Sequence, residues 1–264
     1  MPSPEICPNV SYIGSPEEAP HHIAHGFDVT LAGQPITLPF KNVSRDPDPA
    51  ENPVLIAYFN PNESEALRKA GAREIADRLI ALETEVVLTP TSHKSELMVR
   101  EAAQMASKES GRKIKVIFLP RGPKDQFRSR KKRKEMLYPF TAVTSNGMDD
   151  KYMDFRDDLD EKRFRTLHKK GAKIAIVDDV ISTGGTINAI KHVAQRAINK
   201  GKPKNRRTVL DVPVIAVMEE APLIIDDNDK NYSKWDPQIA PDHHVAIVAP
   251  VLIYKPKKEF EGRG

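Results

Sequence analysis

Short apolar runs alternate along the chain with segments of helical periodicity. Six runs have the length and apolar content of buried strands: 54–59, 85–88, 113–119, 174–177, 212–218 and 245–253. Apolar spacing predicts helices over 66–82, 95–107 and 186–199, and weak alternation over 29–40 predicts a hairpin around Gly33. Strands that alternate with helices are typical of a parallel sheet covered on both faces. The pattern therefore predicts an α/β fold with a central, mostly parallel sheet of about five strands and flanking helices.

The same pattern divides the chain into an arm, one domain and a tail. Residues 1–26 are rich in Pro and predict a poorly ordered arm, residues 27–255 form the domain, and 256–264 are a polar tail. Residues 121–170 interrupt the strand–helix rhythm and are too long for an ordinary α/β connection. We interpret them as a flap or insertion, with a hairpin over 141–152 that turns at Asn146-Gly147.

Composition narrows the class of protein. A single cysteine, Cys7, among 264 residues excludes a disulfide framework and a multi-cysteine metal site. No apolar run approaches the roughly 18–20 residues that a membrane span needs, so we expect a cytoplasmic protein without a membrane partner. The net charge is only +4, from 41 basic and 37 acidic residues, yet six of the seven residues 128–134 are basic. Such a local cluster indicates a specific anionic ligand at least as well as nucleic acid.

The segment 174–186 has the clearest pattern of residues that could bind a ligand. Four apolar residues predict a buried strand, two adjacent carboxylates follow at its carboxyl end, and a loop of small and hydroxylated residues leads into a helix. Open α/β sheets bind ligands at that end of their strands, and the start of a helix is an anion site. The carboxylates cannot bind the anion, so they serve neutral hydroxyls or a metal. A phosphate close to a pair of hydroxyls describes a ribose 5-phosphate.

This segment closely resembles the motif with which type I phosphoribosyltransferases bind 5-phosphoribosyl 1-pyrophosphate (PRPP). Within that family, the chain looks most like adenine phosphoribosyltransferase and its relatives, with a small N-terminal hood over 27–40. The resemblance implies that Asp178 and Asp179 hold the ribose hydroxyls and steady the transition state. It also implies Mg²⁺, held mainly by substrate oxygens and only indirectly by these two carboxylates, and a homodimer. The residues that would cradle the 5-phosphate are Val180, Ser182, Thr183, Gly184, Gly185 and Thr186.

The resemblance also assigns the pyrophosphate and the base. Ser92, His93 and Lys94 stand where the family has its pyrophosphate loop, although Ser95 replaces the usual Gly and His93 is an extra residue. Arg121 would face the same pyrophosphate, and Lys131 of the basic run would act from the flap. The candidates for base binding are Phe59, Asn60, Glu219 and Glu220.

Several of these features have ordinary alternatives. Lys94 could belong to a polar helix cap, Arg121 to the surface, and Glu219-Glu220 to a charged strand end. The run 128–134 is open to three interpretations: a catalytic flap, a nuclear-localisation or nucleic-acid patch that would make a nuclear location conceivable, and a solvated loop.

The favoured function is transfer of the phosphoribosyl group from PRPP to a nucleobase nitrogen, which gives a nucleoside monophosphate and pyrophosphate. A purine is expected, adenine first, and nucleic acid is not the expected partner. The alternative is a non-catalytic regulator that senses PRPP or a nucleotide and binds nucleic acid through the basic loop. A PRPP synthetase would need two copies of the motif, and the chain has one.

Overall fold

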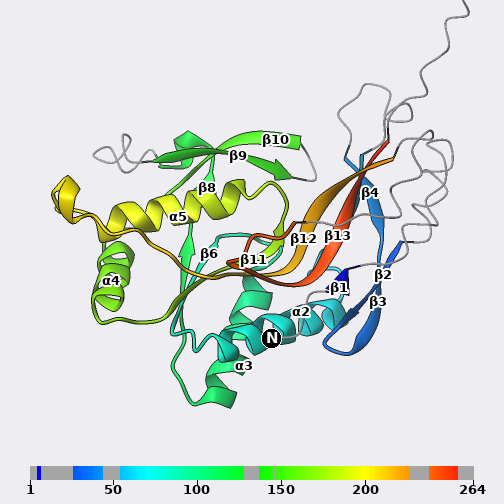
Figure 1. Ribbon diagram of the computed structural model, residues 1–264, viewed down its shortest axis with the longest axis horizontal. Helices are drawn as coiled ribbons and strands as arrows, with labels where there is room; N and C mark the ends of the chain where they lie inside the picture. The colour runs from blue at the N-terminus through cyan, green and yellow to red at the C-terminus, as the bar shows by residue number, and fades with distance from the viewer. Residues whose placement is uncertain are drawn as a thin grey trace, which may run out of the picture.

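The computed structural model describes residues 5–6, 26–43, 54–127, 137–144, 147–225 and 238–254. Most of the predicted arm, the basic run 128–134 with Lys131, and the tail 256–264 lie outside these residues. The described part is a three-layer arrangement in which helices cover both faces of a curled sheet (Figure 1). None of its described helices has the length and apolar composition to cross a membrane.

The central sheet has eight strands among the described residues. Five of them are neighbours in the parallel order β13-β12-β11-β6-β7, and they correspond to five of the six predicted runs. β5 and β4 extend the sheet antiparallel beyond β13, and β1 pairs with β13 in parallel. The predicted α/β class is therefore confirmed. The strands are β1 (Glu5–Ile6), β4 (Phe40–Asn42), β5 (Val54–Ala57), β6 (Val86–Pro90), β7 (Lys115–Leu119), β11 (Ile174–Ile181), β12 (Val214–Ile225) and β13 (His243–Tyr254).

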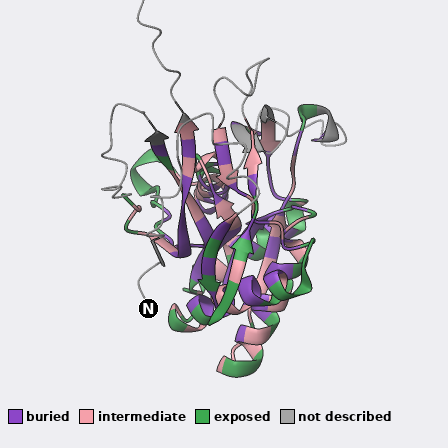
Figure 2. Cartoon of the chain, turned by 90° about the vertical axis from the view of Figure 1, so that its right-hand side faces the viewer, coloured by how far each residue is buried: buried purple, intermediate pink, exposed green. Residues whose placement is uncertain are grey.

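Both faces of the sheet are apolar because successive residues of a strand point to opposite sides. On β11, Ala175 and Val177 pack with the helices α2 (Glu65–Ala81) and α3 (Glu96–Ser110). Ile174 and Ile176 pack on the other side with α5 (Gly185–Ile198) and α4 (Asp158–Lys169). Figure 2 shows the resulting buried interior with exposed residues on the outer helices. The continuous apolar run that predicted this strand thus reflects burial on both faces.

The N-terminal hairpin packs beside α2. Its strands β2 (Phe27–Leu31) and β3 (Gln34–Leu38) are joined by Ala32 and Gly33, both with positive φ, of 49° and 74°. The Ala32 N–H donates to Glu74 Oε1 on α2 at 2.7 Å. Figure 1 shows the hairpin at the α2 side of the sheet.

The segment 121–170 is partly what the sequence predicted. It forms a three-stranded sheet in the order β8-β10-β9, above α5 in Figure 1, from β8 (Arg121–Gly122), β9 (Tyr138–Thr144) and β10 (Gly147–Met153). The predicted hairpin is present but begins earlier than expected, and Gly147 pairs with Thr144 as the first residue of β10 and does not lie in the turn. A short 3-10 turn (Lys124–Phe127) precedes it.

Helix α4, in the same segment, was not predicted. Its sequence is dominated by charge, which hides the apolar side. Asp157 caps its start by accepting from the Asp160 N–H at 2.8 Å, and Phe164 is fully buried with its ring 5.4 Å from that of Phe155. Phe164 therefore anchors α4 on the domain, with Leu167 packed on the same core and Glu161 paired with Lys200.

Strand β12 is longer than predicted. The sequence suggested an end at Met218, because Glu219-Glu220 resembles a strand terminus. The ladder to β13 instead continues to Ile225, through Pro222. This extension carries residues of β12 beyond the body of the sheet.

The order of the parallel strands reverses between β6 and β11. The chain passes from β6 outward to β7, then returns to β11 on the other side of β6 and continues to β12 and β13. The connections after β6 and after β11 therefore leave in opposite directions and open a crevice at their carboxyl ends. The loops 91–95 and 182–184 begin at this crevice.

We predict that Arg78 is a principal tie between α2 and the sheet. It is 4% exposed, and it donates to Glu74 on its own helix and to the Val245 carbonyl of β13 at 2.9 Å. Arg78→Met leaves both acceptors without this buried donor, so the free energy of unfolding should fall by about 3 kcal/mol in urea denaturation.

The matched control is Lys69→Met, on the same helix. Its ion pair with Glu65 is exposed and should contribute less than about 0.5 kcal/mol. Equal losses in the two variants would contradict the proposed role of Arg78.

Candidate functional site

A cavity of about 910 Å³ opens at the carboxyl ends of β6 and β11. Three segments build most of its wall: 54–59, which is β5 with the two residues after it, 91–94 after β6, and 178–187 across the end of β11 and the start of α5. The remaining lining residues are Val43 after β4, Arg121 of β8, Lys151 of β10, Glu220 and Pro222 of β12, and Val251 of β13. The switch in strand order therefore brings residues far apart in sequence to one place.

The start of α5 forms one end of the cavity. Gly184 is the N-cap in the left-handed conformation, with φ of +72°, and no side chain caps the helix at this residue. Gly184, Gly185 and Thr186 all line the cavity, so the first turn of the helix faces it. Backbone N–H groups and the positive end of the helix dipole make this position a binding site for an anion.

Arg121 adds a cation beside this helix start. Its Nη1 donates to the Thr186 hydroxyl at 3.5 Å, and its positive charge acts on Asp178. The sequence placed Arg121 near the other loop, that of Lys94. The structure places it at the Thr186 end, because β8 pairs with Met153 of β10 and holds Arg121 over α5.

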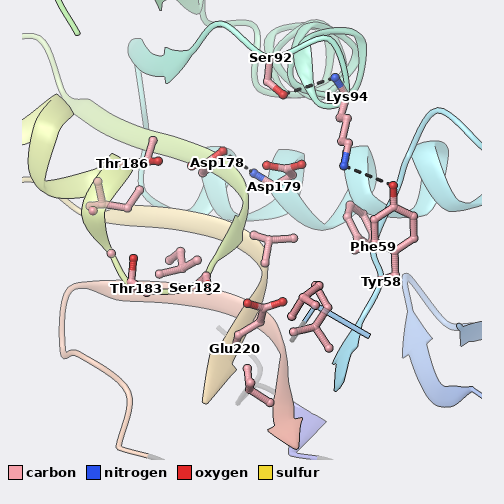
Figure 3. A pocket seen from close by; sticks show the side chains of 18 of the residues that line it. Tyr58, Phe59, Ser92, Lys94, Asp178, Asp179, Ser182, Thr183, Thr186 and Glu220 are labelled. Atoms are coloured by element: carbon pink, nitrogen blue, oxygen red, sulfur yellow. Dashed lines mark hydrogen bonds between the residues drawn. The ribbon is translucent and has the colours of Figure 1, made fainter. Parts of the chain in front are cut away.

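Two adjacent carboxylates occupy the middle of the cavity wall. Asp178 is 3% exposed, whereas Asp179 is half-buried and its N–H donates to Asp178 Oδ1 at 3.0 Å. Burial raises the pKa of Asp178 well above its ordinary value, and the neighbouring Asp179 carboxylate raises it further, while Arg121 opposes the rise. Figure 3 shows the pair between Thr186 on one side and Lys94 on the other.

The loop after β6 forms the opposite end. Ser92 is buried and its Oγ accepts from the Lys94 N–H at 3.3 Å, while the His93 carbonyl accepts from Asn62 Nδ2 at 2.7 Å. The side chain of Lys94 extends across to Tyr58, whose hydroxyl accepts from its Nζ at 3.3 Å (Figure 3). The loop thus presents a lysine whose position depends on a tyrosine from another segment.

Tyr58 joins several polar groups at this point. Its hydroxyl also accepts from Asn60 Nδ2 at 3.3 Å, and both Lys94 Nζ and Lys41 Nζ lie 4.9 Å from the centre of its ring. Ammonium groups over an aromatic face are attracted by the ring quadrupole. Tyr58 therefore concentrates positive charge at the rim near Lys94.

The remaining wall is mostly apolar and has one half-buried acid, Glu220. Val54, Ile56, Pro222 and Val251 line it from the strand ends of β5, β12 and β13. Burial raises the pKa of Glu220, a hydrogen bond with the Ser182 hydroxyl opposes the rise, and the Asp179 carboxylate adds to it. A carboxyl group with a raised pKa can donate as well as accept a hydrogen bond.

Most of the residues singled out from the sequence lie in this one cavity. They are Phe59, Ser92, His93, Lys94, Arg121, Asp178, Asp179, Val180, Ser182, Thr183, Gly184, Gly185, Thr186 and Glu220. Phe59 is only 4% exposed, because its ring packs on α2 at Gly71, where an added Cβ would come within 3.1 Å of it.

Three predicted residues are not placed in the cavity. Glu219 points to the face of β12 opposite Glu220 and lies 3.0 Å from His243 Nδ1, as strand alternation requires. Asn60 stands behind Tyr58, bonded to it and to Glu63 at 2.7 Å. Lys131 lies outside the described residues.

Other lining residues were missed. The polar ones are Tyr58, Thr91 and Lys151; Thr91 directly precedes the predicted Ser92, whereas Tyr58 and Lys151 lie in no motif. Tyr58 directly precedes the two residues that the sequence singled out, so strand alternation at the end of β5 was the available signal. Lys151 lines the cavity only because the hairpin β9–β10 lies over α5. The sequence does not show this packing. The N-terminal hairpin over 27–40 contributes nothing to the lining, and the neighbouring segment 54–59 supplies that wall instead.

A scan against protein-family models finds no match for this chain, and a search of curated protein sequences finds none either. A search of solved structures finds similar folds among purine phosphoribosyltransferases. Adenine phosphoribosyltransferase from Saccharomyces cerevisiae, complexed with an imino-altritol bisphosphate and adenine, is 14% identical with a TM-score of 0.41, over 80% of this chain and 94% of that one.

Two further solved structures are similar at the same level. The purine phosphoribosyltransferase of Pyrococcus horikoshii is 12% identical with a TM-score of 0.37, over 75% of this chain and 92% of that one. Hypoxanthine phosphoribosyltransferase from Trypanosoma cruzi is also 12% identical with a TM-score of 0.37, over 74% and 77%. These are members of the family that the sequence resembles.

The carboxylate pair should make the ligand-free protein less stable than a neutral variant. Because the pKa of Asp178 is raised in the folded state, its stabilising contribution is complete below the ordinary pKa of an aspartate and is lost as the pH rises through the raised value. Asp178→Asn should therefore raise the melting temperature of the ligand-free protein at pH 8, and the gain should shrink towards pH 4.

Asp211→Asn, which neutralises an exposed aspartate outside the cavity, is the matched control and should change the melting temperature little. A destabilised Asp178→Asn variant at pH 8 would contradict the electrostatic interpretation of the site.

Proposed function

We propose that this protein transfers the 5-phosphoribosyl group of PRPP to a nitrogen of a purine base. The observation that carries the proposal is that one cavity combines the uncapped start of α5 with the carboxylates of Asp178 and Asp179. An anion site next to paired acceptors for hydroxyl groups matches the two ends of a ribose 5-phosphate. Neither feature alone would distinguish this ligand from other phosphate esters.

In this proposal the 5-phosphate binds at Ser182–Thr186. The N–H groups of the first turn of α5 and the hydroxyls of Ser182, Thr183 and Thr186 would donate to it. Arg121, which already donates to Thr186, would supply a positive charge at the same end. The ribose then extends from α5 towards Asp178 and Asp179, whose carboxylates would accept from its 2- and 3-hydroxyls.

The pyrophosphate would lie at the Lys94 end. Ser92, Lys94 and the Lys151 side chain of β10 all line the cavity, so donors and cations from two elements would surround it. In the ligand-free protein Lys94 is hydrogen-bonded to Tyr58, which holds its ammonium group at the rim. We propose that Lys94 binds the pyrophosphate from this position.

The base would lie against the apolar wall. Val54, Ile56, Pro222 and Val251 offer a surface for a flat heterocycle, and Glu220 is the titratable group within this part of the wall. Its raised pKa lets it share a proton with a ring nitrogen of a purine. The adenine preference rests on the resemblance of the sequence.

Mg²⁺ would bind at this site mainly through oxygen atoms of the substrate. The described residues contain no group of three or more His, Cys, Asp or Glu side chains that would enclose a metal ion. Asp178 and Asp179 are nonetheless hard oxygen donors that repel one another, and Mg²⁺ commonly binds through few protein ligands and substrate phosphates. When bound, Mg²⁺ would neutralise charge on the pyrophosphate.

In the reaction, the bond between C1 of the ribose and the pyrophosphate oxygen breaks as the purine nitrogen forms its bond to C1. Positive charge develops on the sugar, and the two carboxylates are placed to stabilise it. The electron pair of the broken bond leaves with the pyrophosphate, towards Lys94. The proton of the attacking nitrogen has a nearby acceptor in Glu220 when that group is ionised.

The homodimer, the cytoplasmic location and the single domain over 27–255 stay predictions. The same cavity would also suit a regulator that binds PRPP without turning it over. Measurement of turnover separates that alternative from the enzyme.

The first experiment measures pyrophosphate release from PRPP and Mg²⁺ with adenine, hypoxanthine, guanine, xanthine, uracil and orotate. We expect turnover with a purine, adenine first. The double variant Asp178→Asn/Asp179→Asn should lose about 100-fold or more in kcat/KM, because charge stabilisation in the transition state is removed.

Asp211→Asn is the control for an unrelated carboxylate and should retain full activity. Binding of PRPP by calorimetry without turnover of any base would overturn the enzymatic proposal in favour of the regulator.

We further predict that Tyr58 positions Lys94. Tyr58→Phe keeps the ring beneath the two ammonium groups but removes the hydroxyl that accepts from Lys94, a loss of about 1 kcal/mol. The kcat/KM for PRPP should fall roughly five- to tenfold, with little change in the KM for the base.

Tyr138→Phe is the matched control, because Tyr138 stacks on His192 outside the cavity. A Tyr58→Phe variant with the KM for PRPP and kcat of the parent protein would show that the contact has no role in catalysis.

A further inference from the structure

A second cavity, of about 460 Å³, lies at the far end of α5 from the loop 182–184, for which we proposed phosphate binding and which we call the phosphate loop. We call it the basic hollow; its wall comes from the last turns of α5, the loop 199–209 and Glu161 of α4. None of its residues lines the first cavity. The two cavities therefore lie at opposite ends of one helix.

Four cationic side chains line the basic hollow. They are Arg196, Lys200, Lys202 and Arg207, with Glu161 as the acid in the same wall. Lys200 pairs with Glu161 at 2.7 Å, and Arg196 pairs with the buried Asp154 at 2.6 Å. The hollow thus keeps a net positive charge.

The positive surface continues along the loop. Lys204 and Arg206 are exposed beside Arg207, on the short 3-10 turn Lys204–Arg206. In the described part of the chain, no ion pair to an acid is seen for Lys202, Lys204, Arg206 or Arg207. An anion that entered the hollow would meet charges that the protein itself does not neutralise.

The loop is held in place by hydrogen bonds from α5. Asn199 Nδ2 donates to the Thr208 carbonyl at 2.9 Å, and its Oδ1 accepts from the Thr208 N–H at 2.9 Å. Gln195 Oε1 accepts from the Leu210 N–H at 2.5 Å. The cations are therefore presented by a fixed loop, which lowers the entropic cost of binding.

Capping of the helix does not account for these charges. Cations are favourable near the C-terminus of a helix, and Arg196 stands in the last turn of α5. The carbonyls of Gln195 and Ala197 already accept from the N–H groups of Asn199 and Lys200 at 3.3 Å. Lys202 and Arg207 lie beyond this turn, so the helix end does not explain them.

Two histidines, on α4 and α5, have pKa values that these cations help to lower. The pKa of His192, which lines the hollow, is lowered by burial and by the charge of Arg196. The pKa of His168 on α4 is lowered by burial and by the charge of Lys202. An anion bound among these cations would oppose both effects.

We propose that the basic hollow binds a small molecule that carries a chain of phosphates. Its volume suits a ligand of this size, and Lys202 and Arg207 in its wall, with Lys204 and Arg206 on the adjoining turn, would meet the phosphate charges. Val209, which is 86% exposed in the lining, offers an apolar contact to a nucleoside if one is attached. This proposal does not depend on the reaction proposed for the first cavity.

The hollow is connected with the first cavity through α5 and the hairpin above it. His192 stacks on Tyr138 of β9, with ring centres 4.0 Å apart. β9 pairs with β10, which brings Lys151 to the first cavity, while the N-terminus of α5 forms the phosphate loop there. A ligand in the hollow would therefore contact the helix whose other end lies at the first cavity.

The test is binding of ATP, GTP and inorganic tripolyphosphate to the full chain, followed by NMR titration of His168 and His192. We expect the apparent pKa of both histidines to rise on binding. Lys202→Glu/Arg207→Glu should weaken binding at least tenfold and abolish the histidine response. If tripolyphosphate binds as tightly as ATP and GTP, the phosphates alone are recognised. If ATP and GTP bind more tightly, the nucleoside also contributes to binding.

Lys108→Glu/Lys113→Glu, on exposed lysines of α3 and the residues that follow it, makes the same change in net charge elsewhere and should bind like the parent protein. Equal weakening in the two double variants, or no response of the histidines in the parent protein, would overturn the proposal. So would binding of an RNA oligonucleotide to this face without binding of the small phosphates.

Discussion

The pairing of β6 with β11 is the contact on which the site depends. These strands run side by side in parallel, with Ile174, Ala175 and Ile176 opposite Val86, Val87 and Leu88. The register sets which residues leave the sheet together, so the loop that holds Lys94 and the loop that holds Gly184 begin at the same edge. Because both strands are buried on both faces, a shift of register would expose apolar residues, and the alignment of the two loops is protected by the hydrophobic core.

The first cavity brings two carboxylates of like charge together. Asp178 is buried next to another carboxylate, which raises the free energy of the folded protein, and the charge of Arg121 and the hydrogen bond from the Asp179 N–H relieve part of this cost. Cations and helix N–H groups stand at both ends, at Lys94 and at α5. A site with acids in the middle and positive ends is thus complementary to a ligand with hydroxyls in the middle and phosphates at its ends. The cost of folding such a site is recovered only when the ligand binds.

Sequence reasoning succeeded where local pattern and chemistry coincide. The segment 174–186 combines a buried strand, two acids and a helix start within one stretch, so its place at the end of β11 followed directly. It failed where contacts between distant segments determine the local structure or the position of a side chain. Helix α4 depends on one buried aromatic, Phe164, in a charged segment, and Lys151 lies in the cavity only because a distant hairpin covers α5. The adjacent acids Glu219 and Glu220 differ only in which face of β12 they occupy, and that requires the register with β13.

The extension of β12 past the body of the sheet separates two tasks within one cavity. Glu220 and Pro222, with Val251 beside them on β13, line the cavity from strand ends whose neighbouring residues Leu223 and Leu252 pack in the core, whereas the end proposed for the ribose phosphate is built from the central strand and its helix. Substitutions at these strand ends would alter the wall without disturbing the sheet. In evolutionary terms, descendants of such a protein could change the molecule that they accept at one end while inheriting the other end unaltered.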